Sequence, residues 1–168
     1  MSSAEDIADM VVNLRKEKRY SDAEKMLRNA IKDDENAWQL WNQLGHVLVA
    51  IQKHREAASA FETATQLNPN GFWLWLSLGY ARKENIQFEA AIDATLRATK
   101  LTTKPNELGS ALYNLGCYNC IAGRHDEAIE YLDKAFQMDE SFKSWALDDP
   151  DLKSLKTDER FQRMVESD

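Results

Sequence analysis

The sequence predicts an all-α fold, an α-solenoid of antiparallel helix hairpins that ends in a short helical cap. Leu-Gly pairs recur with spacings of 34 and 37 residues, at Leu44-Gly45, Leu78-Gly79 and Leu115-Gly116. Around these pairs the apolar residues are three or four positions apart, which is the period of a helix and not of a strand. Clusters of polar residues, Gly and Pro interrupt this pattern at regular intervals. Self-similarity of this kind is typical of repeat proteins.

Four repeats follow from this period, and we place them at residues 4–37, 38–71, 72–108 and 109–140. Each repeat holds two helical runs, separated by short breaks at residues 18–20, 52–54, 85–87 and 123–125. Turn-forming clusters separate the repeats at residues 33–36, 68–71 and 102–106. The third cluster is where the extra residues of the longer spacing are expected. We predict one domain of four hairpins, followed by a cap at residues 141–168.

Small residues at the predicted helix crossings support the hairpins. The Gly of each Leu-Gly pair and a recurrent Ala of the second helix let the paired helices approach closely, and Trp41, Trp75 and Leu112 fill the remaining space. A Gly inside a helix costs about 1 kcal/mol relative to Ala, so its recurrence indicates a close helix contact. Ser21 followed by Glu24 predicts a capping box at the start of a second helix. Gly123 suits the left-handed residue that ends a helix.

These residues resemble the signature of the tetratricopeptide repeat family, which is Trp-x2-Leu-Gly-x2-Tyr followed by Ala, Phe, Ala and Pro. Residues 38–71 match nearly every position, with Leu48 in place of the Tyr. The third and fourth repeats match more loosely, with Arg82 and Asn119 at that position, and the first matches by its period and its Ala pattern. The resemblance implies a right-handed superhelix in which the first helix of each hairpin lines a concave face.

Residues 141–168 have a different pattern and are expected to cap the array, since a solenoid leaves an apolar face on its last repeat. Asp149 and Pro150 suit the N-cap and the first position of a helix. Thr157 lies at another possible helix start, and Trp145 is the expected anchor of the cap. The segment also resembles the Asp-Pro-Asp-Leu closing segment that follows many bacterial-type arrays of this family.

Composition and charge exclude several classes of protein. The chain is 43% hydrophobic and 29% charged, with a net charge of −7 that is spread along the sequence. It has no long apolar run that suits a membrane and no basic stripe that suits a nucleic-acid backbone. The first residues lack the basic and apolar regions of a signal peptide. We therefore expect a cytoplasmic protein that binds neither nucleic acid nor membrane.

Few residues are candidates for chemistry. Cys117 and Cys120 have the C-x-x-C spacing, but they lie within a predicted helix, and no second Cys pair completes a zinc site. We interpret them as buried or groove-lining thiols, with a metal or redox role as the alternative. His54 and His125 fall in turns, and no phosphate-binding loop or nucleophile motif is present. The sequence therefore predicts a protein that is not an enzyme and has no cofactor.

The family resemblance also implies which side chains face the groove. Its centre is aromatic, apolar and neutral, while charged residues such as Arg15 lie at its rim. The candidate peptide-binding residues are Asn42, His46, Trp73, Leu76, Tyr80, Tyr113 and Cys117. The cations of the family's chaperone-tail clamp are missing from the corresponding positions. We predict a scaffold that binds a protein partner, as a peptide or a helix, in this groove. The alternative is a self-associating homo-oligomer whose groove is filled by its own chain.

Overall fold

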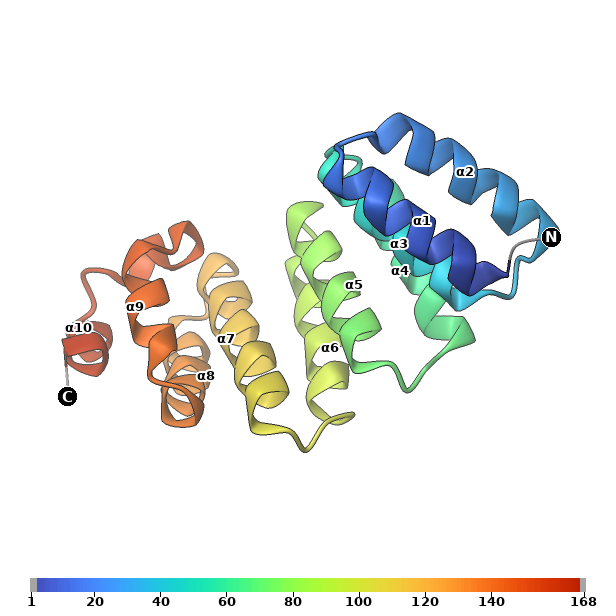
Figure 1. The fold of residues 1–168 in the computed structure, drawn as a ribbon. Helices are drawn as coiled ribbons and strands as arrows, with labels where there is room; N and C mark the ends of the chain where they lie inside the picture. Colours follow the sequence, from blue (N-terminus) through green and yellow to red (C-terminus); the bar gives the residue numbers. More distant parts are fainter. Residues whose placement is uncertain (1–2, 167–168) are drawn as a thin grey trace. The chain divides into compact units, whose positions relative to one another are not determined.

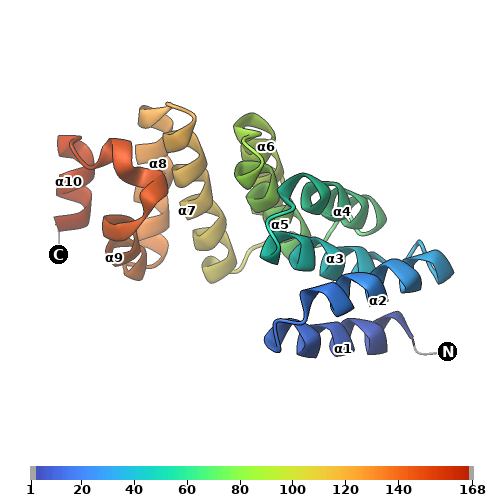
Figure 2. The ribbon, with the colours of Figure 1, turned by 90° about the horizontal axis from the view of Figure 1, so that it is seen from above.

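The computed structural model describes residues 3–166, which form helices joined by short loops (Figure 1, Figure 2). The chain divides into two compact units, residues 1–86 (unit 1) and 87–168 (unit 2). Unit 1 contains α1 (Ala4–Lys16), α2 (Tyr20–Asp33), α3 (Trp38–Ala50), α4 (His54–Leu67) and α5 (Phe72–Glu84). Unit 2 contains α6 (Phe88–Thr99), α7 (Pro105–Ile121), α8 (His125–Met138), α9 (Ser141–Asp148), the 3-10 helix η1 (Pro150–Leu155) and α10 (Glu159–Glu166). Between residues 3 and 166, none of the helices combines the length and the apolar character that a membrane crossing requires.

The predicted all-α array of helix hairpins is confirmed. Within unit 1 the helices pack in consecutive pairs, α1 with α2 and α3 with α4, and within unit 2 α7 packs against α8. The boundary between the units falls inside the predicted third repeat, between α5 and α6. That the four repeats form one domain stays a prediction.

A left-handed residue stands in the turn between the two helices of every repeat. These residues are Lys18, Gln52, Ile86 and Gly123, with φ of 58°, 60°, 59° and 79°. Lys18, Gln52 and Ile86 follow one another at the 34-residue period of the repeat. Gly123 has the left-handed conformation that the sequence predicted for it at the end of a helix. Gly adopts this conformation at no steric cost, whereas a β-branched residue such as Ile86 is strained there.

The start of α2 differs from the prediction. The helix begins at Tyr20, directly after the left-handed turn, so Ser21 already lies inside it and does not cap it. Glu24 instead forms ion pairs with Arg28 at 2.8 Å and with Lys53 at 3.2 Å. Because Lys53 stands at the start of α4, the second pair joins neighbouring hairpins, and the predicted capping box is wrong.

Glycines of the Leu-Gly pairs stand where the two helices of a hairpin cross. A Cβ added at Gly45 would lie 2.6 Å from a ring carbon of Phe61 on α4. A Cβ added at Gly116 would lie 2.6 Å from Cγ of Leu132 on α8. Both partner side chains are buried. The predicted close contacts are therefore confirmed in one hairpin of each unit.

The tryptophans divide into structural and exposed residues. Trp41 donates its indole N–H to the carbonyl oxygen of Glu35 at 2.8 Å, and Trp75 donates to that of Pro69 at 2.9 Å. Each bond joins a first helix to the loop that precedes it, so the signature tryptophans set the angle at which the chain enters the repeat. Trp145, in contrast, is 60% exposed, and the prediction that it anchors the cap is wrong.

The helix α7 is longer than the first helices of unit 1. It begins at Pro105 and has 17 residues, whereas α3 and α5 have 13 each. Pro lacks a backbone N–H and has a fixed φ, and both properties suit the first helical position. The extra residues of the longer spacing therefore extend the start of a helix, and only part of the predicted separator at 102–106 forms a loop.

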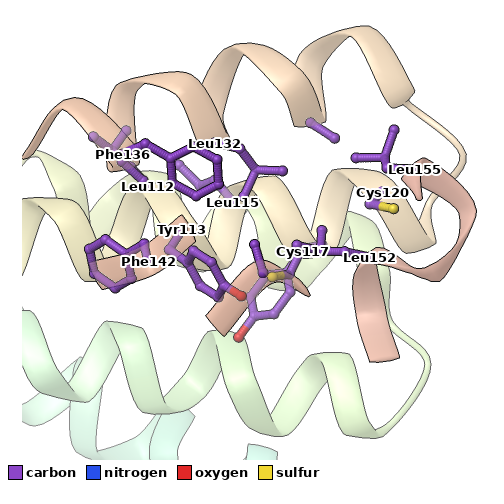
Figure 3. Close-up of a cluster of buried hydrophobic side chains, with 14 of the residues drawn as sticks. Leu112, Tyr113, Leu115, Cys117, Cys120, Leu132, Phe136, Phe142, Leu152 and Leu155 are labelled. Carbon is purple, nitrogen blue, oxygen red and sulfur yellow. The ribbon is translucent and has the colours of Figure 1, made fainter. Parts of the chain in front are cut away.

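Unit 2 ends in the predicted helical cap. Its larger buried side chains are Phe142, Leu152, Leu155 and Phe161, which belong to the same core as residues of α7 and α8. Figure 3 shows the first three of them beside α7. Asp149 accepts a hydrogen bond from the backbone N–H of Asp151 at 2.9 Å, and so caps η1 as predicted. On α9 it is thus Phe142, and not Trp145, that anchors the segment.

Candidate functional site

The candidate residues of unit 1 lie on α3 and α5, and we call this set the unit 1 face. Asn42 and His46 are partly buried on α3. On α5, Leu76 is buried, whereas Trp73 is 57% exposed and Tyr80 is 42% exposed. Residues seven apart are two helical turns apart, so the two rings lie on the same side of α5. The unit 1 face therefore offers two accessible aromatic surfaces, with Leu76 beneath them.

His46 is a neutral member of this face. Its ring meets the ring of Phe61 edge-on, with centroids 5.0 Å apart and an interplanar angle of 77°. Burial lowers the pKa of His46 to about 4, and the nearby Arg15 guanidinium acts in the same direction. The imidazole is therefore uncharged at neutral pH, where it can donate and accept one hydrogen bond each.

Arg15 adds a positive charge beside the unit 1 face. It is partly buried near the end of α1, and its Nη1 donates to Oε1 of Gln43 on α3 at 3.0 Å. Among the residues that the structure describes, no carboxylate forms an ion pair with it. The sequence places Arg15 at the groove rim, but no sequence signal shows whether a carboxylate of the same chain reaches it.

In unit 2 the predicted groove residues Tyr113 and Cys117 are covered by the C-terminal segment of the chain (Figure 3). The ring of Phe142 stacks on Tyr113, with centroids 5.1 Å apart and an interplanar angle of 18°. Tyr113 is 7% exposed and Cys117 is 3% exposed. Neither side chain is open to a peptide, because α9 and the residues that follow it cover this side of α7. This finding corrects their assignment as peptide contacts.

Asp149 holds the covering segment on α7. Its Oδ2 accepts a hydrogen bond from the Tyr113 hydroxyl at 2.8 Å and lies 3.5 Å from Sγ of Cys117. Burial is the main cause that raises the pKa of Tyr113 and of Cys117, and the negative charge of Asp149 adds to it. Both groups therefore stay protonated and remain donors to the carboxylate. Sequence reasoning identified Asp149 as a helix cap and missed this second role.

The second thiol, Cys120, belongs to a short hydrogen-bonded chain. Its Sγ lies 3.1 Å from Oγ of Ser154, which in turn lies 3.1 Å from Nε2 of His125, at the edge of a hollow of about 590 Å³. Burial raises the pKa of Cys120, and a protonated thiol is a poor nucleophile. Within residues 3–166, no three His, Cys, Asp or Glu side chains are grouped to hold a metal ion. The geometry therefore favours a structural role for both thiols over a metal or redox role.

Comparison with known proteins agrees with this architecture. Residues 39–70 and 109–142 match the family model of the tetratricopeptide repeat. A crystal structure of a MamA protein is 22% identical, over 96% of this chain and 86% of its own, with a TM-score of 0.80. MamA 41-end from Desulfovibrio magneticus RS-1 is 23% identical, over 83% of this chain and 77% of its own, with a TM-score of 0.74. A MamA structure designated MSR-1 is 25% identical, over 84% and 79%, with a TM-score of 0.72. The two matched segments are therefore tetratricopeptide repeats, and the fold of the chain is the helical-repeat fold of these structures.

Proposed function

We propose that the protein is a non-enzymatic scaffold that binds a segment of another protein on the unit 1 face. The observation that carries the proposal is the exposure of Trp73 and Tyr80 on one side of α5. Aromatic side chains combine a large apolar surface with few rotatable bonds, and Trp and Tyr are enriched among the residues that dominate binding energy. A partner segment lying across α3 and α5 covers both rings and meets the neutral His46 and Asn42 beside them.

Each of the two rings is expected to matter for affinity. Truncating an interface aromatic that acts as an anchor typically costs about 2 kcal/mol or more. A loss of this size weakens the dissociation constant about 30-fold. Loss of either ring should therefore produce a measurable loss of binding, with the polar neighbours setting orientation.

The test is capture of partners from a lysate of the source cells, quantified by mass spectrometry. The bait is the wild type, the Trp73→Ala/Tyr80→Ala double variant, or the matched Trp145→Ala/Leu147→Ala variant. Trp145 and Leu147 are exposed to a similar degree, at 60% and 52%, but lie on α9 in unit 2. We expect the first variant to lose specific partners and the second to keep every partner other than a second copy of this chain. Equal recovery of every protein by all three baits contradicts the proposal.

Self-association is the second candidate function, and the exposed Trp145 and Leu147 on α9 favour it. They give each copy a further apolar surface that a second copy can cover. Light scattering over a range of concentrations is the test, with the Trp145→Ala/Leu147→Ala variant as the comparison. A monomer mass at every concentration rules this candidate out. The cytoplasmic location and the lack of nucleic-acid binding stay predictions from composition.

A further inference from the structure

The partly buried guanidinium of Arg15 has one side-chain hydrogen bond, from Nη1 to Gln43, and no carboxylate partner among residues 3–166. A guanidinium carries five N–H donors, and removing it from water costs free energy unless an anion compensates. Arg82, the other partly buried arginine of unit 1, is paired with Glu62 at 3.2 Å. Arg15 is therefore a cation whose burial is not compensated within the described chain.

The position of Arg15 connects it to the unit 1 face. Its partner Gln43 follows Asn42 directly on α3, and α1 packs against α3. The charge of Arg15 also acts on the imidazole of His46, one turn further along α3. An anion that reaches Arg15 thus lies beside Asn42 and His46, the members of the unit 1 face on α3.

In unit 2, the side of α7 that corresponds to the unit 1 face is covered by the chain's own C-terminal segment. Tyr113 of α7 stands at the repeat position that Asn42 and Leu76 occupy in unit 1. The chain's own segment places the ring of Phe142 on Tyr113 and, seven residues later, the carboxylate of Asp149 within hydrogen-bond distance of the Tyr113 hydroxyl. The segment that covers this surface in unit 2 therefore includes an aromatic ring and an acidic side chain, together with the apolar residues of η1.

We propose that the segment bound by unit 1 carries an acidic side chain that pairs with Arg15, next to an aromatic or large apolar residue that packs on Trp73 and Tyr80. This inference rests on the proposed function, because it specifies the partner of the same face. Guanidinium and carboxylate form two parallel charge-assisted hydrogen bonds, which add specificity as well as affinity. The desolvation of Arg15 is already incurred in the free protein, so pairing it costs less than burying an exposed cation on binding.

The experiment is selection from a library of random 16-residue peptides, each fused at its C-terminus so that side chains supply the only carboxylates. The baits are the wild type, Arg15→Gln, Trp73→Ala/Tyr80→Ala, and Arg82→Gln as the matched control. Thermal melts establish that each bait is folded, and Arg15→Lys is the conservative variant should Arg15→Gln fail to fold. We expect wild-type selections to enrich Asp or Glu at a constant distance from an aromatic residue. Arg15→Gln should lose the acidic enrichment and keep the aromatic one, and Arg82→Gln should keep both.

Selected peptides are then synthesised with the acidic residue or with its amide. The change of Glu to Gln should weaken binding to the wild type about 10- to 100-fold and leave binding to Arg15→Gln unchanged. Two results overturn the inference and leave the proposed function standing. One is that peptides selected on the wild type show no enrichment of Asp or Glu. The other is that the enrichment of Asp or Glu persists in peptides selected on Arg15→Gln. Failure of the wild type to enrich any peptide over the Trp73→Ala/Tyr80→Ala bait overturns the proposed function itself.

Discussion

Replacing Gly45 by Ala tests the helix packing on which the repeat architecture depends. The added Cβ lies 2.6, 2.7 and 2.8 Å from three ring carbons of Phe61, which is 1% exposed. Carbon atoms in contact are best placed about 3.5–4.0 Å apart, so the ring must move by about 1 Å within a filled core. Overpacking of this kind costs about 1–3 kcal/mol, and the better helix propensity of Ala offsets about 1 kcal/mol. Because all three contacts are this short and Phe61 is fully buried, we expect an overpacking cost of about 2–3 kcal/mol and a net destabilisation of about 1–2 kcal/mol.

The assay is thermal and urea unfolding of a double-mutant cycle with Phe61→Leu, followed by circular dichroism. In the wild-type background, Gly45→Ala should lower Tm by about 2–8 °C. In the Phe61→Leu background the ring is absent, so the same change should be neutral or stabilising by up to about 1 kcal/mol. The coupling between the two sites should be about 1–3 kcal/mol. A higher Tm for Gly45→Ala alone, or a coupling of zero, refutes the close crossing of α3 and α4.

Three further predictions concern the turns, His46 and the cap. Ile86→Gly should raise the free energy of unfolding by about 1 kcal/mol, because it removes a β-branched residue from a position with positive φ. Gly123→Ala in the equivalent turn should lower the free energy of unfolding by a similar amount. Thermal melts of the two variants should therefore show a higher Tm for the first and a lower Tm for the second. As the pH falls from about 6.5 to about 4, the free energy of unfolding should decrease by about 1–3 kcal/mol more in the wild type than in His46→Gln. The reason is that the imidazole of His46 binds a proton over this range in the unfolded protein but not in the folded one. Urea unfolding at several pH values measures this difference, and identical pH profiles speak against it. Tyr113→Phe should cost about 1–2 kcal/mol and speed proteolysis after residue 140, because Asp149 loses a donor; an unchanged digestion rate contradicts that role for the bond.

Most of the fold was predictable because each hairpin repeats the same local contacts. Gly45 and Gly116 recur at equivalent positions of the sequence, and this recurrence alone indicates close crossings, because a Gly inside a helix needs a packing reason. The left-handed residues could be located only at Gly123, since Gln52 and Ile86 adopt the same conformation without the glycine that signals it. Periodic apolar residues therefore determine where the helices lie, and the turn geometry follows from the helices it joins.

The candidate site was less predictable because it depends on contacts between distant residues. Tyr113 and Asp149 are 36 residues apart, and no periodic pattern links them. Phe142 and Trp145 are both aromatic residues of one short helix, and only the tertiary packing decides that Phe142 turns inward. In the same way, no carboxylate among residues 3–166 pairs with Arg15, and its position in the repeat does not reveal this property of its surroundings.

The two units use equivalent helix faces differently, and this difference separates binding from stability. On α7 the chain's own segment buries Tyr113, so substitutions there remove contacts that the folded protein already makes and should lower its stability. On α5, Trp73 and Tyr80 are 57% and 42% exposed, so their truncation should lower Tm less than a change at Tyr113, while it removes partner binding. Arg15 extends the argument. It is a partly buried cation with no carboxylate partner among residues 3–166, so replacing it relieves a desolvation cost that offsets the lost hydrogen bond to Gln43, and stability should be unchanged or raised. A residue whose replacement leaves the stability of the free protein unchanged or raised, but weakens partner binding, has its role in the complex with the partner.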